Sequence, residues 1–232
     1  KDYLTCNTQD NIFIKEKFYS ELTFHYWYWK NQLNYENDTD WIGFCQKRRF
    51  WIKNEAKEKK INTNNANNFL VDNIEELPKN VESIICEPIK VNNVKKMKMI
   101  KRGIKLLIKN PSIFFDTSKQ TIKFHFDMHH GYKNLEKAIS VMNEKDRFEF
   151  LHYVENNISY NPHIMVISKK RILNEWFSSL FEWLFKCENI YGFDKLKGYD
   201  TQRLYAFLGE RYLSFWFKKY TIYKENHWRL IE

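Results

Sequence analysis

The sequence predicts an α/β protein in which helices flank a central mixed sheet. Four short apolar runs have the length and content of strands, at residues 41–45, 83–86, 121–126 and 163–168. Segments with the helical spacing of apolar residues alternate with these runs, and such alternation is typical of α/β architecture. The 232 residues are 43% hydrophobic, which is enough to bury the core of a single domain over 1–232.

The first helix is expected over about residues 18–33. Leu22, Tyr26, Trp29 and Leu33 fall on one stripe of this helix. Aromatic rings beside a lysine also suit stacking on bases or sugar rings, although rings at helical spacing belong more often to a core.

Two arginines follow the first expected strand. Trp41–Cys45 predicts a buried strand, and Arg48 and Arg49 come directly after it. A guanidinium donates two parallel hydrogen bonds, so paired arginines suit a phosphate. Open α/β sheets bind their ligands at the switch point beyond the carboxyl end of a strand, before a helix. Adjacent strand residues point to opposite faces, so at most one arginine enters a given pocket unless the strand has ended. The alternative is a pair of surface arginines.

Residues from about 54 to 115 are interpreted as a variable insertion. Residues 54–73 are rich in Lys, Glu and Asn, which predicts a solvated loop. Residues 94–109 predict a basic amphipathic helix. One face holds Ile100, Ile104, Leu107 and Ile108, and the other holds lysines and Arg102. Such a helix fits either a membrane surface or a core contact with a solvated lysine face.

A polar cluster follows the third apolar run, at Asp127, His129 and His130. On a strand that continues, His125 would share a face with Asp127 and His129. Side chains of this kind serve catalysis or ligand binding, and Asp127 is the residue that a metal would use if one were bound. The alternative is a set of histidines that caps the end of a strand.

Two long helices close the chain, near Arg171–Cys187 and Thr201–Lys218. The second is apolar almost all round, as a helix within a core is. It holds Arg203 and Glu210, which share a face. Partial burial brings a carboxylate toward the proton affinity of a general base, so Glu210 is a catalytic candidate. A structural ion pair of Glu210 with Arg203 or Arg211 is the alternative.

Composition excludes several classes of protein. No apolar stretch reaches the roughly 18 residues that span a bilayer, and no signal segment opens the chain. Cys6, Cys45, Cys86 and Cys187 are scattered, which argues against a disulfide framework or a zinc site. We therefore expect a soluble protein of the reducing cytoplasm. The net charge of +9 suits a nucleotide, a nucleic acid or an anionic membrane, although an AT-rich genome also encodes chains rich in Lys and Asn.

Six motifs, taken in order, give the chain a resemblance to a known family. They are ELT-xx-YW-x-WKN, IGFC-x-x-RRF, DMHHG, SYNPHIMVIS, WFSSLFEWLF and RLYAFLGERYLSFWF. The series resembles a bacterial family of capsular and exopolysaccharide glycosyltransferase-like proteins, and it covers nearly the whole chain outside about 54–115. The resemblance implies a GT-A-like fold. It also implies a transferase that moves a sugar from a nucleotide-sugar donor, above all a UDP-sugar, to a growing capsular or surface polysaccharide.

The resemblance also implies roles for residues of this chain. The diphosphate and nucleotide of the donor would be bound by Arg48, Arg49, Asn11, Lys30 and Arg203. The sugar or the acceptor would be bound by Glu21, Tyr26, Trp29 and Asn161. The base that deprotonates the acceptor hydroxyl would be Glu210, with His129, His130 and Asp127 as alternatives. A transfer that retains anomeric configuration requires no such base.

No cofactor is required by the sequence. The GT-A resemblance implies an Asp-x-Asp metal site after the strand that ends at Cys45, and no such motif is present there. On this reading the arginines would stabilise the departing diphosphate, with Mg²⁺ or Mn²⁺ as the alternative. The expected acceptor is an oligosaccharide or a lipid-linked glycan, met at the inner face of the cell membrane through a peripheral contact, and no nucleic acid is expected. The competing hypothesis is a glycan- or nucleic-acid-binding module without catalysis.

Two departures from the family pattern accompany the resemblance. The family begins with a strand and loop suited to the nucleotide, whereas this chain begins at Lys1, shortly before Asn7–Asn11. We therefore expect a fragment of a longer protein that lacks the N-terminal strand. The HYRR motif of the family is replaced by Gln46-Lys47-Arg48-Arg49, so only the arginines correspond.

Overall fold

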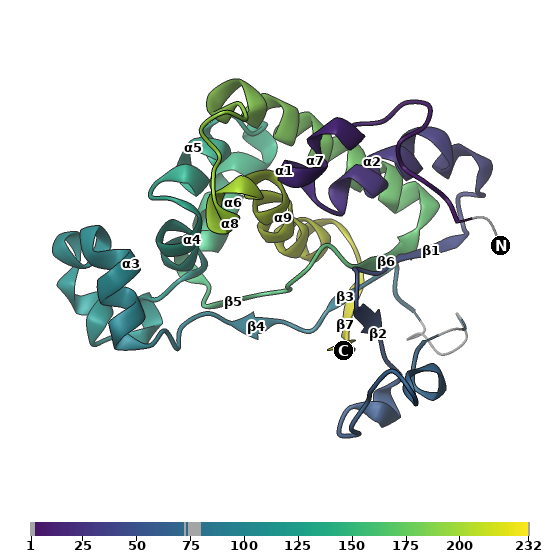
Figure 1. The fold of residues 1–232 in the computed structure, drawn as a ribbon, viewed down its shortest axis with the longest axis horizontal. Helices are drawn as coiled ribbons and strands as arrows, with labels where there is room; N and C mark the ends of the chain where they lie inside the picture. The colour runs from purple at the N-terminus through teal and green to yellow at the C-terminus, as the bar shows by residue number, and fades with distance from the viewer. Residues whose placement is uncertain (1–2, 72, 74–79, 232) are drawn as a thin grey trace.

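A small mixed sheet lies along one side of a layer of helices in the computed structural model, which describes residues 3–71, 73 and 80–231 (Figure 1). The helices are α1 Glu16–Tyr19, α2 Leu22–Asn31, α3 Lys96–Lys109, α4 Ile122–His130, α5 Asn134–Ser140, α6 Glu144–Asn156, α7 Lys170–Tyr191, α8 Tyr199–Gln202 and α9 Leu204–Tyr220. The strands are β1 Trp41–Phe44, β2 Arg49–Trp51, β3 Ser83–Cys86, β4 Ile89–Lys90, β5 Ser159–Tyr160, β6 Val166–Lys169, β7 Tyr223–Asn226 and β8 Trp228–Leu230. The predicted α/β class with a mixed sheet is confirmed. Among the described residues, no helix combines the length and the apolar content that crossing a membrane requires.

The main sheet has the strand order β1-β6-β3-β7. β6 runs antiparallel to β1 and to β3, whereas β3 and β7 are parallel. β3 is an inner strand and all its residues are buried, as its apolar run predicts. β1 is an edge strand in which Gly43 is exposed and only Phe44 is buried. The predicted strand at 41–45 is therefore present, but the prediction that it is buried is wrong for most of its residues.

After β1 the chain makes a turn instead of entering a helix. Arg48 has a φ of 64° in this turn, which is closed by a hydrogen bond from the Arg49 amide to the Gln46 carbonyl at 3.0 Å. Arg49 then begins β2, which pairs with β8 in a separate two-stranded sheet. The predicted switch point between a strand and a helix at these arginines is therefore wrong.

The run at 121–126 forms the helix α4, so the predicted strand there is wrong. Thr121 caps the helix, because its hydroxyl accepts a hydrogen bond from the Phe124 amide at 3.3 Å. Neighbouring elements enclose α4 on several sides, and alternate residues are therefore all buried, namely Ile122, Phe124, Phe126 and Met128. This burial gave the sequence the period of two that is typical of a strand.

Helical periodicity located α2, α3, α7 and α9 correctly, with shifted ends. The first helix is interrupted at Ser20, which has a φ of 52°, and the last begins at Leu204 after the separate α8. The fourth apolar run forms a strand only from Val166. The sequence did not predict α5, α6 or the short strands β2, β4, β5, β7 and β8. The described part of the predicted loop at 54–73 contains two short 3₁₀ turns, and residue 72 lies outside the described residues.

Asn161 ties three elements together in the core. Its side chain is fully buried, and its amide donates to the Cys86 carbonyl at 2.6 Å and to the Glu225 carboxylate at 2.9 Å. Its own carbonyl accepts from the Ser214 hydroxyl at 2.6 Å. The residue thus joins β3, β7 and α9, and it fixes the start of the segment 160–164.

Replacing Asn161 with alanine should lower the free energy of unfolding by about 3 kcal/mol, because the Cys86 carbonyl and the Glu225 carboxylate each lose the hydrogen bond that the Asn161 amide donates, and the Ser214 hydroxyl loses one acceptor. Urea denaturation of the purified protein measures this loss. The matched control is Asn156→Ala at an exposed position of α6, where a change within about 0.5 kcal/mol is expected. Equal losses in the two variants would show that the Asn161 network does not hold the fold.

Candidate active site

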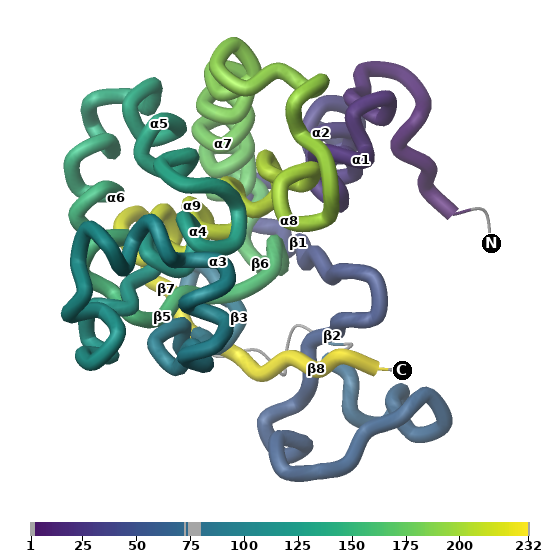
Figure 2. The backbone as a smooth tube through the Cα atoms, turned by 60° about the vertical axis from the view of Figure 1, so that its left-hand side comes forward, coloured from purple at the N-terminus to yellow at the C-terminus, as the bar shows by residue number. Residues whose placement is uncertain are grey.

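A cleft of about 350 Å³ is lined by residues of α4, α8 and α9, of the turn after β1 and of the segment 160–164. Figures 1 and 2 show α4, α8 and α9 near one another. We call this cleft the histidine cleft, after His125, His129, His130 and His163. Residues with roles predicted from the sequence converge there from five segments, namely Glu21, Arg49, His129, His130, Arg203 and Glu210. Lining residues without a predicted role include Lys98, Tyr160, His163 and Asp200.

Several predicted residues lie elsewhere. Arg48 is exposed in the turn, and Asn11 lines a shallow pocket near the N-terminal end, where its amide donates to the Gln9 carbonyl at 2.9 Å. Asn161 is in the core. Asp127 sits at the end of α4 and accepts from the Lys133 amide at 3.0 Å, and burial raises its pKa to about 6.

Tyr26 and Trp29 of α2 pack against α7 and do not line the cleft. Trp29 stacks on Phe181 with the ring centroids 5.7 Å apart, and Tyr26 meets the same ring edge-on at 5.1 Å. The Lys30 ammonium lies over the Trp29 ring at 3.5 Å. The sequence left open whether these rings pack in the core or stack on bases or sugar rings, and in the structure they pack in the core.

A buried ion pair forms the floor of the cleft. The Arg211 side chain is 2% exposed, and its guanidinium pairs with Glu210 and lies 4.0 Å from the centroid of the Tyr160 ring. Glu210 also accepts from the His163 amide at 2.6 Å. Both carboxylate oxygens of Glu210 therefore have protein partners. The predicted alternative of a structural pair with Arg211 is present.

The α4 histidines are held neutral by their surroundings. His125 and His129 are one helical turn apart, with ring centroids separated by 4.6 Å. Burial, reinforced by the nearby cations, lowers the pKa of His130 to about 3 and that of His129 to about 4. Burial also lowers the pKa of His125 to about 2, with the charge of Arg211 adding to the effect.

Hydrogen bonds set the tautomers of two of these rings. A carbonyl can only accept, so Nδ1 of His130 donates to the Asp200 carbonyl at 2.8 Å and Nε2 is left as an acceptor. A guanidinium can only donate, so Nδ1 of His129 accepts from Arg102 at 2.9 Å. The cleft therefore presents neutral histidines that are already oriented.

Three cations of the cleft have no carboxylate partner among the described residues: Arg49, Lys98 and Arg203. The carboxylates that could neutralise them are already engaged, because Glu210 pairs with Arg211 and Asp200 pairs with Arg102 at 2.9 Å. Glu21 is freer, since its hydrogen-bond partner is the Ser20 hydroxyl at 2.5 Å. The cleft thus presents more positive than negative charge toward a ligand.

Strain and unpaired polar atoms also gather at this cleft. Ser20, Arg48 and His163, with φ of 52°, 64° and 68°, all lie in its walls or in the turn that forms one of them. Such conformations cost about 1–3 kcal/mol each and cluster at functional sites. Four buried nitrogens at the cleft have no hydrogen-bond partner in the described structure, on Arg49, His125, His163 and Arg211. The strained backbone and the unpaired nitrogens mark this cleft as a candidate functional site.

The donor set does not fit a metal held by the protein. Of the carboxylates that line the cleft, only Glu21 is outside an ion pair. Asp38 and Asp40 precede β1 at the end away from the cleft, and they pair with Lys170 at 2.7 Å and with the Asn37 amide at 2.8 Å. Within residues 3–71, 73 and 80–231, no three His, Cys, Asp or Glu side chains are arranged to hold a metal ion.

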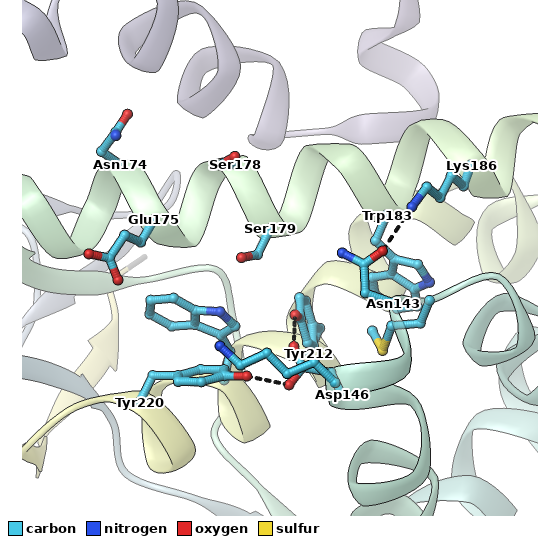
Figure 3. A pocket seen from close by; sticks show the side chains of 13 residues that line it. Asn143, Asp146, Asn174, Glu175, Ser178, Ser179, Trp183, Lys186, Tyr212 and Tyr220 are labelled. Atoms are coloured by element: carbon cyan, nitrogen blue, oxygen red, sulfur yellow. Dashed lines mark hydrogen bonds between the residues drawn. The ribbon is translucent and has the colours of Figure 1, made fainter.

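A second pocket, of about 440 Å³, lies between α7, α9 and the start of α6 (Figure 3). Its buried carboxylate, Asp146, accepts from Tyr212 at 2.7 Å, from Tyr220 at 2.6 Å and from Lys219 at 3.0 Å. Figure 3 shows these tyrosines pointing toward Asp146. This carboxylate is saturated by the fold, and no residue with a predicted role lines the pocket. The histidine cleft is therefore the candidate active site.

Sequence reasoning missed Lys98, Tyr160 and His163, and it gave His125 and Arg211 no function. The four-residue spacing of His125 and His129 is a helical signal that the strand assignment concealed. His163 follows the Asn161-Pro162 turn, where a residue that shapes a loop is expected. Lys98 approaches the cleft only through tertiary packing of α3, which no local pattern reveals.

Comparison with known proteins adds a family and a fold. A family model described as a domain of unknown function (DUF4422) matches residues 1–221. The structure is similar to the apo structure of the WbbM bifunctional glycosyltransferase, with a TM-score of 0.72 over 98% of this chain at 18% sequence identity. The chain spans 39% of that protein. At this identity the likeness is one of fold. No curated protein sequence matches the chain.

The neutral histidines predict a pH dependence of stability. The pKa of His130 is about 3 in the folded protein against about 6.5 in the unfolded chain, so below pH 6.5 the unfolded state binds the additional proton. Stability should therefore fall as the pH is lowered from 7 to 5. Asp127, with its raised pKa, acts in the opposite direction in this range.

Replacing His130 with glutamine should reduce the fall in the free energy of unfolding between pH 7 and pH 5 by about 2 kcal/mol. Glutamine does not titrate, so the unfolded variant binds one proton fewer at pH 5. Urea denaturation at pH 7 and at pH 5 gives the difference. His152→Gln, at an exposed position of α6, is the matched control and should keep the wild-type fall. A His130→Gln variant with the wild-type pH dependence would contradict the assignment of a neutral, buried His130.

Proposed function

Because this chain belongs to the DUF4422 family and its fold is similar to that of a bifunctional glycosyltransferase, we propose that it transfers a sugar from a nucleotide-sugar donor to a glycan acceptor. A UDP-sugar is the proposed donor, and a capsular or other surface polysaccharide is the proposed product. The observation that supports this function most directly is the set of unpaired cations in the histidine cleft, Arg49, Lys98 and Arg203.

A nucleotide sugar leaves its diphosphate behind as the sugar departs, and negative charge develops on the leaving oxygen. Fixed cations stabilise such charge best when no protein carboxylate already neutralises them. Arg49 has a buried Nε without a partner, and Arg203 lies beside the Tyr199 ring with its guanidinium carbon 5.5 Å from the centroid. Together with Lys98 they would bind the diphosphate. The neutral histidines would add oriented hydrogen bonds without repelling the cations.

Three carboxylates line the cleft; Asp200 is paired with Arg102, and the surroundings of Glu21 and Glu210 suggest different roles for these two. Glu210 is held by Arg211 and the His163 amide, so we assign it to positioning the segment 160–164. Glu21 keeps most of its acceptor capacity, so we assign it to the proton of the acceptor hydroxyl, in place of Glu210. This assignment applies to a transfer that inverts anomeric configuration.

The neighbouring arginines provide a test of donor binding. Arg49→Gln should weaken UDP binding about ten-fold or more, since a charge-assisted hydrogen bond is lost, whereas Arg48→Gln should leave it within about two-fold. Isothermal titration of UDP, with and without Mg²⁺ or Mn²⁺, measures both affinities. Equal effects of the two substitutions would contradict the placement of the diphosphate. Binding that requires the metal would contradict the role given to the cations.

Replacing Glu21 with glutamine tests the acceptor side. The expected result is a kcat lowered about 100-fold with the affinity for UDP unchanged, because proton transfer contributes factors of this size. The rate of UDP release from UDP-sugars in the presence of oligosaccharide acceptors gives kcat. Ser118→Ala, at an exposed position far along the chain, should behave as wild type. A Glu21→Gln variant with wild-type kcat would contradict the assignment, and a wild-type protein that binds UDP without turnover would favour a binding module.

A further inference from the structure

Helix α3 presents three different faces. Its first face packs on α4 through Met99, Gly103 and Leu107, which are buried. A Cβ atom at Gly103 would lie in ordinary van der Waals contact with Met128, at 3.6 Å, so this position faces α4 directly. The predicted apolar stripe was expected to face the core through Ile100, Ile104, Leu107 and Ile108, and of these only Leu107 is buried.

The second face borders the histidine cleft. Lys98 lines it, and Arg102 bonds to His129 at 2.9 Å and to Asp200 at 2.9 Å. The position of α3 and the geometry of the cleft are thus coupled through charged contacts.

The third face is apolar and open. It consists of Met97, Ile100, Ile104 and Ile108, whose side chains are 65%, 43%, 48% and 73% exposed. Their spacing of three and four residues aligns them in one stripe along the helix. In Figure 1 the helix lies at the end of the molecule opposite the N-terminus. A continuous apolar stripe of this kind on a surface marks an interaction site.

The charge around the stripe identifies the partner. The sequence of α3 is KMKMIKRGIKLLIK, which contains six basic residues and no acidic one. Lys101 and Lys105 border the stripe, are exposed and have no ion-pair partner among the described residues. A second copy of this chain would bring like charges together. An anionic bilayer satisfies both the apolar stripe and the lysines beside it.

We propose that α3 lies in the surface of an anionic membrane, with Met97, Ile100, Ile104 and Ile108 inserted among the lipids and the neighbouring lysines on the headgroups. The contact is peripheral and parallel to the membrane plane. Because the adjacent face of the same helix borders the cleft, membrane binding holds the cleft beside the bilayer. A lipid-linked glycan would then reach the cleft from the membrane, and this consequence rests on the proposed function, whereas the contact itself does not.

Co-sedimentation of the whole protein with vesicles tests the contact. We expect binding to vesicles that contain phosphatidylglycerol and about ten-fold weaker binding to phosphatidylcholine alone. Ile100→Glu/Ile104→Glu should abolish binding, whereas Phe148→Glu, which changes a side chain 74% exposed on α6, should not. Equal melting temperatures of the variants and the wild type would exclude unfolding as the cause of lost vesicle binding. Wild-type binding by the Ile100→Glu/Ile104→Glu variant would overturn the proposal.

The contribution of Lys101 and Lys105 is tested with a double substitution and a control of equal charge change. Lys101→Glu/Lys105→Glu should weaken vesicle binding about ten-fold or more, and Lys59→Glu/Lys60→Glu carries the same change of charge at exposed positions outside α3 and should not. Equal losses in the two variants would mean that only net charge matters and would overturn the proposal. A wild-type protein that dimerises, becomes monomeric with Ile104→Glu and ignores vesicles would also overturn it. UDP titration of the same variants distinguishes failure of the membrane proposal from failure of the proposed UDP site. Their affinity for UDP should equal that of the wild type, whatever their binding to vesicles.

Discussion

The architecture of the cleft depends on one buried ion pair. Arg211 is enclosed by the core, lies against the Tyr160 ring and finds its carboxylate in the neighbouring Glu210. Removing one partner of such a pair leaves an uncompensated buried charge, which costs about 3–5 kcal/mol. Glu210 in turn accepts from the amide of His163 and holds that residue at a positive φ. Helix α9 thereby fixes the wall of the cleft formed by 160–164.

The same pair determines the electrostatics of the site. Because Glu210 is engaged by Arg211 and Asp200 by Arg102, the cations Arg49, Lys98 and Arg203 keep their charge for a ligand. The buried guanidinium also helps to lower the pKa of His130, so the ring stays neutral near pH 7 and contributes hydrogen bonds instead of charge. The free energy of unfolding therefore falls at low pH, because the histidines of the unfolded chain bind protons that the buried histidines of the folded cleft do not bind.

The sequence allowed most of the long helices to be predicted, with α6 as the exception, and left their contacts open. Helices α2, α3, α7 and α9 follow from helical periodicity, and β3 from its apolar run. α4 was misread because it is enclosed on several sides, so alternate residues are buried as they are in a strand. Only Arg49 of the two arginines lines the cleft, and the strand rule does not account for this, because β1 ends at Phe44 and Arg48 lies in the turn before β2. No local pattern indicates which cations lack a partner, because that depends on packing between distant segments.

The central claim is that the histidine cleft, and not the α7 pocket beside Asp146, binds the nucleotide diphosphate. Hydrogen–deuterium exchange with and without saturating UDP tests it most directly, because both pockets are followed in one experiment. The expected result is protection of segments 46–50, 160–164 and 199–211, with 142–146 and 174–186 unchanged. Protection confined to 142–146 and 174–186 would contradict the claim.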